Sequence, residues 1–181
     1  MESPWAGAPR HFLQPCTIFA HREEHCVSTI LGSCIAICLW DPALGLGGMN
    51  HYMLPLWNGE GLATPKYGNI AIDRLITRML GLQGRRDRLV AKMFGGARVL
   101  RADTSPFAVG TRNIQLAREL LAGQGIPILA AETGGTTGMK IHFNTRTGKV
   151  LLARLSQEAP FAADLPDGRP RAALERLRGL S

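Results

Sequence analysis

Cys34 and His51 are the two residues of this 181-residue sequence whose side chains make the strongest case for catalysis. Cys34 follows Gly32 and Ser33 in a tight turn between two apolar runs, where unpaired backbone N–H groups or a nearby imidazole would favour its thiolate. His51 lies in a mostly apolar run, and an imidazole is costly to bury unless its nitrogens form hydrogen bonds. We interpret the two residues as a candidate nucleophile and general base. The plainer alternatives are a small buried cysteine and a core histidine with satisfied nitrogens.

A thiol and an imidazole need two further kinds of group before they can act together. One group must orient the imidazole, and the candidates are Ser28, Thr29 and Asn50. Donors must also stabilise the oxyanion that forms on attack of a carbonyl. The backbone N–H groups of the turn at Gly32 and Ser33 are candidates for this role, and Asn50 is expected in the same vicinity.

The elements that would hold these residues are short β-strands. Residues 27–30, 35–40 and 49–54 are apolar and are separated by turn-forming residues. The last two runs are joined by a short connection rich in glycine, which predicts a hairpin. In a hairpin, antiparallel neighbours lie side by side. His51 is therefore expected to return toward the start of the preceding strand, next to Cys34.

The rest of the chain alternates between helical and extended patterns. Apolar residues recur at helical spacing over 70–80, with Asn69 as the expected N-cap, and again over 113–121. Four further strands are predicted over residues 90–94, 126–131, 140–143 and 150–155. The order of these elements predicts a mixed α/β (α+β) fold, and the length fits a single domain.

Composition narrows the classes of function. The chain has 21 basic and 14 acidic residues, and its charge of +7 favours acidic partners only by general steering. The one tight basic cluster, residues 85–88, contains an acidic residue and no aromatic residue, so we expect no binding of nucleic acid. No apolar run is long enough for membrane insertion, and no secretory signal precedes the domain. Four cysteines without an export signal are best interpreted as reduced thiols of a cytoplasmic protein.

Six segments form an ordered set of motifs, namely residues 28–39, 47–55, 67–68, 92–97, 110–113 and 133–135. In this order they resemble the successive motifs of the CheD family, the chemoreceptor glutamine deamidases. The resemblance covers about residues 12–155, which we take as the CheD-like deamidase domain. It leaves residues 1–11 as a flexible N-terminal segment and residues 156–181 as a C-terminal tail that can form a short helix.

The resemblance implies roles for individual residues. Cys34 is similar to the family's nucleophile and His51 to its general base. In the family a threonine six residues before the cysteine completes the triad, and this sequence has Ser28 there, followed by Thr29. Adjacent strand residues face opposite sides, and we prefer Ser28 over Thr29 on register. Met139 stands where the family motif would present an arginine, so that arginine's role is not transferred.

The resemblance also implies an activity, partners and an architecture. The activity is hydrolysis of receptor glutamine side chains to glutamate with release of ammonia, without a metal or an organic cofactor. The partners are the cytoplasmic domains of chemoreceptors, as protein substrate, and a CheC-type phosphatase. The alternative function is a non-catalytic binding module that regulates such a phosphatase. The implied architecture is a single-domain layered fold with a β-sandwich-like core flanked by helices.

A competing signal comes from residues 21–25, which match the H-x-x-E-H pattern of a class of zinc peptidases. That pattern requires a helix, which places both histidines on one face. Here the segment lies between two predicted strands, so we expect a solvated turn and no metal site.

Overall fold

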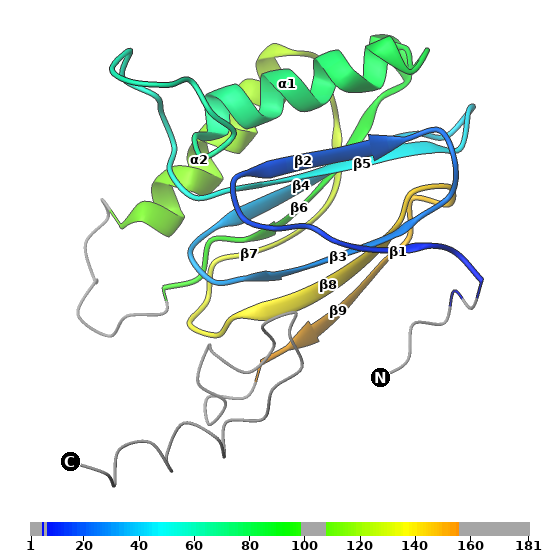
Figure 1. Ribbon diagram of the computed structural model, residues 1–181. Coiled ribbons are helices and arrows are strands. Elements are labelled where there is room, and N and C mark those ends of the chain that lie inside the picture. Colours follow the sequence, from blue (N-terminus) through cyan, green and yellow to red (C-terminus); the bar gives the residue numbers. More distant parts are fainter. Residues whose placement is uncertain (1–4, 6, 99–107, 156–181) are drawn as a thin grey trace, which may run out of the picture.

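Two β-sheets face each other in the protein, and two helices cover the outer face of the larger sheet (Figure 1). The structure is a computed structural model that describes residue 5, residues 7–98 and residues 108–155. In chain order its elements are β1 (Arg10–Phe12), β2 (Thr17–His21), β3 (Cys26–Leu31), β4 (Ile35–Asp41), β5 (Leu46–Tyr52), α1 (Gly68–Gly81), the 3₁₀-helix η1 (Arg86–Arg88), β6 (Val90–Gly95), α2 (Val109–Gly123), β7 (Ile128–Thr133), β8 (Met139–Asn144) and β9 (Val150–Arg154).

The larger sheet has the strand order β2-β5-β4-β6-β7, and the smaller sheet has the order β1-β3-β8-β9. Two neighbouring pairs, β1 with β3 and β6 with β7, are parallel, and the others are antiparallel. The chain passes from the smaller sheet to the larger one between β3 and β4, through Gly32, Ser33 and Cys34. The turn that carries the candidate nucleophile is therefore a connection between the two sheets.

The central strands β4 and β5 are covered on both faces, and their side chains alternate between two apolar clusters. Ile35, Ile37 and Leu39 of β4 belong to the cluster beneath the helices. Ala36 and Cys38 belong to the cluster between the sheets. We call these two groups of residues the helix-side cluster and the inter-sheet cluster.

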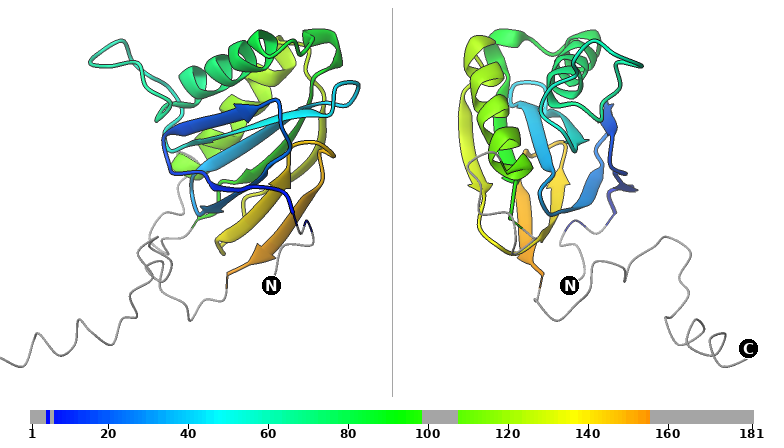
Figure 2. Two further views of the ribbon diagram at one scale, coloured as in Figure 1. Left: turned by 45° about the vertical axis from the view of Figure 1, so that its right-hand side comes forward. Right: turned by 90° about the vertical axis from the view of Figure 1, so that its left-hand side faces the viewer.

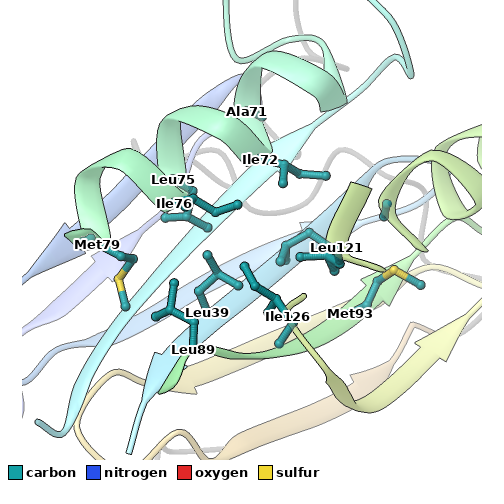
Figure 3. Close-up of a cluster of buried hydrophobic side chains, with 14 of the residues drawn as sticks. Leu39, Ala71, Ile72, Leu75, Ile76, Met79, Leu89, Met93, Leu121 and Ile126 are labelled. Carbon is teal, nitrogen blue, oxygen red and sulfur yellow. The ribbon is translucent and has the colours of Figure 1, made fainter. Parts of the chain in front are cut away.

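Both helices present an apolar face to the larger sheet. The buried residues of α1 recur at helical spacing and point toward the strands (Figure 3), namely Ala71, Ile72, Leu75, Ile76 and Met79. From α2, Ala117 and Leu121 join the same helix-side cluster. In both views of Figure 2 the helices lie on the same side of the sandwich. The smaller sheet therefore closes only the other side of the larger one.

The predicted fold class is confirmed, with two helices packed on a two-sheet core in the described residues. The predicted hairpin is β4–β5, in which Ala36 is the cross-strand partner of His51. This register returns His51 to the beginning of β4, as the sequence predicts. The strands predicted later in the chain correspond to β6, β7, β8 and β9.

The helix starts differ from those predicted. The N-cap of α1 is Tyr67, which makes no side-chain capping bond, and the helix begins at Gly68. Asn69 is not the N-cap, because its Oδ1 accepts the backbone N–H of Trp57 at 3.0 Å. This side chain orders the loop before the helix instead. The second helix, α2, begins earlier than predicted, at Val109.

The N-terminal boundary also differs. Residues 10–11, which the sequence assigns to the flexible N-terminal segment, form part of β1 and pair with β3. The predicted tail, residues 156–181, lies outside the described residues. Neither α1 nor α2, the two α-helices of the described ranges, combines the length and apolar character that crossing a bilayer requires.

Candidate active site

A chain of two hydrogen bonds holds His51 in the space between the sheets. Its Nδ1 lies 2.8 Å from Oγ1 of Thr29, and the same hydroxyl donates to the carbonyl of Leu13 at 2.8 Å. A threonine hydroxyl has one hydrogen, and a carbonyl oxygen can only accept. Because that hydrogen goes to Leu13, the hydroxyl accepts its second bond from the Nδ1–H of His51. The neutral ring therefore carries its proton on Nδ1 and leaves Nε2 as the basic nitrogen.

Nε2 of His51 is the atom available for proton transfer. The residue is 2% exposed, and Nε2 has no hydrogen-bond partner within the described parts of the chain. Burial lowers the pKa of His51 to about 4, because the imidazolium would lose its hydration. At neutral pH the ring is therefore uncharged and able to accept a proton.

The preference for Ser28 as the partner of His51 is wrong, and the structure places Thr29 there. Adjacent residues of β3 do face opposite sides, as the register argument requires. Val27 and Leu31, which share a face with Thr29, belong to the inter-sheet cluster. Ser28 therefore lies on the outer face of the smaller sheet, away from the imidazole.

Cys34 lies at the end of the inter-sheet turn, immediately before β4. It is two positions before Ala36, the cross-strand partner of His51, and its part-buried side chain packs against the inter-sheet cluster. Diagonal positions across an antiparallel pair are within reach of side chains. Because Nε2 has no partner, the thiol and the imidazole are not hydrogen-bonded in this state, which is common in catalytic sites without substrate.

The thiol is uncharged in the resting site. The pKa of Cys34 is raised to about 11, first by burial and then by the nearby Cys16, while the backbone N–H of Cys34 itself acts in the opposite direction. The thiol of Cys34 and the imidazole of His51 are thus both neutral at neutral pH. The resting site therefore contains no thiolate. The thiol of Cys34 would have to lose its proton as it attacks a substrate.

The carbonyl groups of the turn, residues 32–34, are all held from outside the turn. In chain order they accept hydrogen bonds from the N–H of Ala97 at 2.8 Å, the side-chain amide of Asn113 at 3.1 Å and the N–H of Gly96 at 2.8 Å. Among the described residues, the first two N–H groups of the turn have no acceptor. Two backbone donors beside Cys34, the candidate nucleophile, are therefore of the kind that an oxyanion hole requires.

The end of β6 approaches this turn so closely that only glycine fits. Gly95 has φ of 106°, and a Cβ there would lie 2.1 Å from the carbonyl oxygen of Cys34. The sequence marks residues 92–97 as a motif without indicating this contact. The glycine allows the backbone of β6 to pack directly against the backbone of Cys34, the candidate nucleophile.

Asn50, a candidate to orient the imidazole, lies on the other face of β5 from His51. Asn50 is fully buried, and its Oδ1 accepts the N–H of Ile37 at 2.9 Å. It neighbours His51 in β5, so its side chain lies on the opposite face, the one that carries the helix-side cluster. Asn50 cannot orient His51 from there, and its expected place near the substrate stays a prediction.

The segment at residues 21–25 is a bend, as predicted. His21 ends β2, and His25 precedes β3. The two rings pack edge to face with centroids 5.0 Å apart. The helix that the zinc-peptidase pattern requires is replaced by a connection between the two sheets.

The chain matches a known protein family. The family model of CheD, described as chemotactic sensory transduction, matches residues 53–154, which is more than half of the chain. The chain belongs to the CheD family. The resemblance inferred from the six sequence motifs is thereby confirmed.

Close relatives of this CheD chain carry one name, "Probable chemoreceptor glutamine deamidase CheD". The protein of Trichlorobacter lovleyi is 50% identical over 154 residues, which cover 84% of this chain and 96% of that protein. Those of Sulfurimonas denitrificans and Rhodospirillum rubrum are 43% and 45% identical and cover 79% and 80% of this chain, and 92% and 81% of their own length. A match over 84% of the chain necessarily includes Cys34 and His51.

Two residues of this CheD chain, Met139 and Asn113, have surroundings that were not predicted from the sequence. Met139, where the resemblance suggests an arginine, is 1% exposed and packs in the inter-sheet cluster. Asn113 belongs to a recognised motif, residues 110–113, but its contact with the turn was not predicted. No local pattern signals that contact, because it joins residues 80 positions apart in the chain.

Proposed function

We propose that the protein is a cysteine-dependent glutamine deamidase that acts on chemoreceptors. Membership of CheD and the names of its relatives support the reaction and the substrate class. The single observation that carries the mechanism is the hydrogen-bond chain from His51 through Thr29 to Leu13, which leaves a basic Nε2 at the end of the sandwich where Cys34 lies. The expected place of action is the cytoplasm.

The first step is attack on the glutamine carboxamide. Nε2 of His51 removes the thiol proton of Cys34 as the sulfur bonds to the carbonyl carbon, and the carbonyl oxygen becomes an oxyanion. The N–H groups of Gly32 and Ser33, which have no acceptor among the described residues, would donate to that oxyanion. Thr29 accepts the Nδ1–H of the imidazolium and so keeps the ring in one orientation.

The second step releases the amide nitrogen. The imidazolium of His51 donates its Nε2 proton to the nitrogen, and the C–N bond breaks. Ammonia departs, and the substrate acyl group remains bound to Cys34 as a thioester. His51 then takes a proton from water, the hydroxide attacks the thioester carbon, and the thiolate leaves. Cys34 recovers its proton from the imidazolium, and the receptor side chain is now glutamate.

The test is incubation of a receptor cytoplasmic fragment with the wild type and with Cys34→Ala. The wild type should release ammonia and produce the glutamine-to-glutamate mass change in receptor peptides, and Cys34→Ala should do neither while remaining folded. Cys16→Ala is the matched control, since Cys16 is also part-buried and lies near Cys34. It should retain activity. Unchanged release by Cys34→Ala would remove the nucleophile from this proposal.

Cys34→Ala also tests the proposed binding of a CheC-type phosphatase. A CheC-type phosphatase is expected to bind the folded chain whether or not the thiol is present, because binding needs the surface and not the nucleophile. Retained phosphatase binding by inactive Cys34→Ala would separate the two functions. A wild type that binds the phosphatase but deamidates no receptor would favour the binding module instead.

A further inference from the structure

Asn113 of α2 joins the two segments that carry the candidate nucleophile and base. Its side-chain Nδ2 donates to the carbonyl of Ser33 at 3.1 Å and to the carbonyl of Met53 at 2.9 Å. Ser33 directly precedes Cys34, and Met53 follows His51 by two residues. One amide group thus uses both of its hydrogens to hold the turn and the end of β5 together.

A third contact makes the same connection from the helix backbone. The carbonyl oxygen of Asn113 accepts the hydroxyl hydrogen of Tyr52 at 2.6 Å. Burial raises the pKa of Tyr52, so its hydroxyl stays protonated and remains a donor. Tyr52 is the residue after His51 in β5. The first turns of α2 are therefore tied to the strand that carries the base.

The start of α2 also supports the other donors to the turn. A Cβ on Gly110 would lie 2.6 Å from the carbonyl oxygen of Gly96, and a Cβ on Gly96 would lie 2.6 Å from the side chain of Ile114. Gly96 is the residue whose N–H holds the carbonyl of Cys34. Close packing at both glycines presses α2 against the segment beneath the nucleophile.

The hydrogen bond from Asn113 to the carbonyl of Ser33 also fixes the orientation of the neighbouring N–H, that of Cys34. The C=O of Ser33 and the N–H of Cys34 belong to one planar peptide unit and point in opposite directions. A donor that holds the oxygen therefore sets the direction of the N–H as well. That N–H lies beside the sulfur of Cys34 and acts to lower the pKa of its thiol. Asn113 thus acts on the nucleophile through a rigid backbone unit.

Stability alone gives a poor account of this side chain. Asn113 is fully buried, and its Oδ1 has no hydrogen-bond partner among the described residues. A buried polar atom without a partner costs free energy, and asparagine favours a helix less than leucine or alanine does. An apolar residue of similar size would avoid both costs. What it could not do is donate to two carbonyl groups.

We propose that Asn113 is a positioning residue of the deamidase site, which aims the Ser33–Cys34 peptide unit and fixes it relative to the strand of His51. This inference rests on the proposed function. Without the amide, the carbonyl groups of Ser33 and Met53 lose their shared donor, and the peptide unit is free to rotate. The N–H of Cys34 then no longer favours the thiolate of that residue.

The test compares Asn113→Leu and Asn113→Ala with the wild type. Both variants lose the amide N–H donors of Asn113. Leucine keeps about the volume of the asparagine side chain, so Asn113→Leu can still be measured if Asn113→Ala does not fold. In either variant kcat should fall about 100-fold, an effect similar in size to the loss of one preorganised donor in other active sites, while KM changes little. Asn144→Ala is the matched control, because Asn144 is equally buried and hydrogen-bonded but lies at the turn between β8 and β9. It should lose stability without losing kcat.

A second measurement needs no receptor. The rate at which iodoacetamide alkylates Cys34 follows the thiolate fraction, so its pH midpoint should move upward in Asn113→Leu and stay in place in Asn144→Ala. If the wild type fails to deamidate receptors, the proposed function fails, but the shift in alkylation still tests Asn113. An unchanged midpoint, or a kcat in Asn113→Leu no lower than in Asn144→Ala, would overturn the positioning role.

Discussion

The two faces of the hairpin β4–β5 have different chemical character although they share one backbone. On one face, Ile35, Ile37 and Leu39 pack under the helices in the helix-side cluster. Figure 3 shows Leu39 among the side chains of this cluster. On the other face, the inter-sheet cluster ends at a thiol, Cys34, and an imidazole, His51. The period of two along a strand separates the residues that build the fold from those that can do chemistry.

This separation has a physical advantage. The helix-side cluster excludes water from the central strands of the larger sheet, so their packing does not depend on the polar groups of the opposite face. The polar end of the inter-sheet space is where β3 crosses to β4, and the turn there leaves backbone N–H groups without acceptors in the described chain. Changes on the two faces should therefore affect different properties, stability on one and catalysis on the other.

The largest effect is expected from His51→Gln. Glutamine can retain a hydrogen bond with Thr29 but cannot accept the thiol proton. Deamidation, measured as ammonia release, should fall by about 1,000-fold or more, within the range of general-base catalysis combined with nucleophile activation. Circular dichroism should show a folded protein. A variant that retained a tenth of wild-type activity would mean that His51 is only a core histidine.

Leu75→Ala, in the cluster on the other face of the hairpin, should lower stability and leave catalysis unchanged. Leu75 of α1 is fully buried in the helix-side cluster, so its truncation leaves a cavity and should lower the free energy of unfolding by about 2–5 kcal/mol. Among the molecules that remain folded, kcat should be unchanged. Leu129→Ala is the control, since Leu129 is 59% exposed on β7 and should change stability by less than about 0.5 kcal/mol. A large loss of kcat in folded Leu75→Ala would break the separation between the faces.

A smaller effect on activity is expected from Thr29→Val, which keeps the shape of the side chain and removes the hydroxyl. The Nδ1–H of His51 and the carbonyl of Leu13 then lose their partner, and nothing fixes the tautomer of the ring. We expect kcat/KM to fall about 10- to 100-fold. Ser28→Ala, one residue away on the outer face, should leave it unchanged. Equal losses in both variants would show that the hydroxyl matters to β3 and not to the imidazole.

The sequence predicted the parts of this arrangement that are local. The β4–β5 hairpin follows from two apolar runs with a short connection, and once it forms, His51 must return to the beginning of β4. The start of α1 was missed because Asn69 has two uses for its side chain, and the loop residue Trp57 competes successfully for it. Local propensity cannot decide such a competition.

The parts of the site that depend on packing between distant segments could not be predicted. Alternation along β3 says that only one of Ser28 and Thr29 can reach the imidazole. Which one does so depends on which face of β3 meets the larger sheet, a property of the assembled sandwich. The role of Asn113 depends on how α2 docks against the turn, and no sequence period reports that docking.

The smallest expected effect is on the pH dependence of stability, and it also distinguishes the faces. No side chain of the helix-side cluster titrates between pH 4 and 7, whereas burial lowers the pKa of His51 from 6.5 to about 4. Between those values the unfolded chain binds a proton that the folded chain does not, so stability rises with pH. The contribution of His51 is complete above pH 6.5 and is lost as the pH falls toward 4.

Comparison of wild type and His51→Gln isolates this contribution. Urea unfolding at pH 7 and at pH 4.5 should show that the wild type loses about 1–2 kcal/mol more than the variant, a figure reduced from the full shift because buried groups relax. His11 and His142, whose pKa values burial also lowers, titrate in both proteins and cancel in the difference. Parallel losses would mean that His51 already accepts a proton in the folded site near pH 6. In that case the resting base would be partly charged, and the thiol of Cys34 would be activated before the substrate arrives.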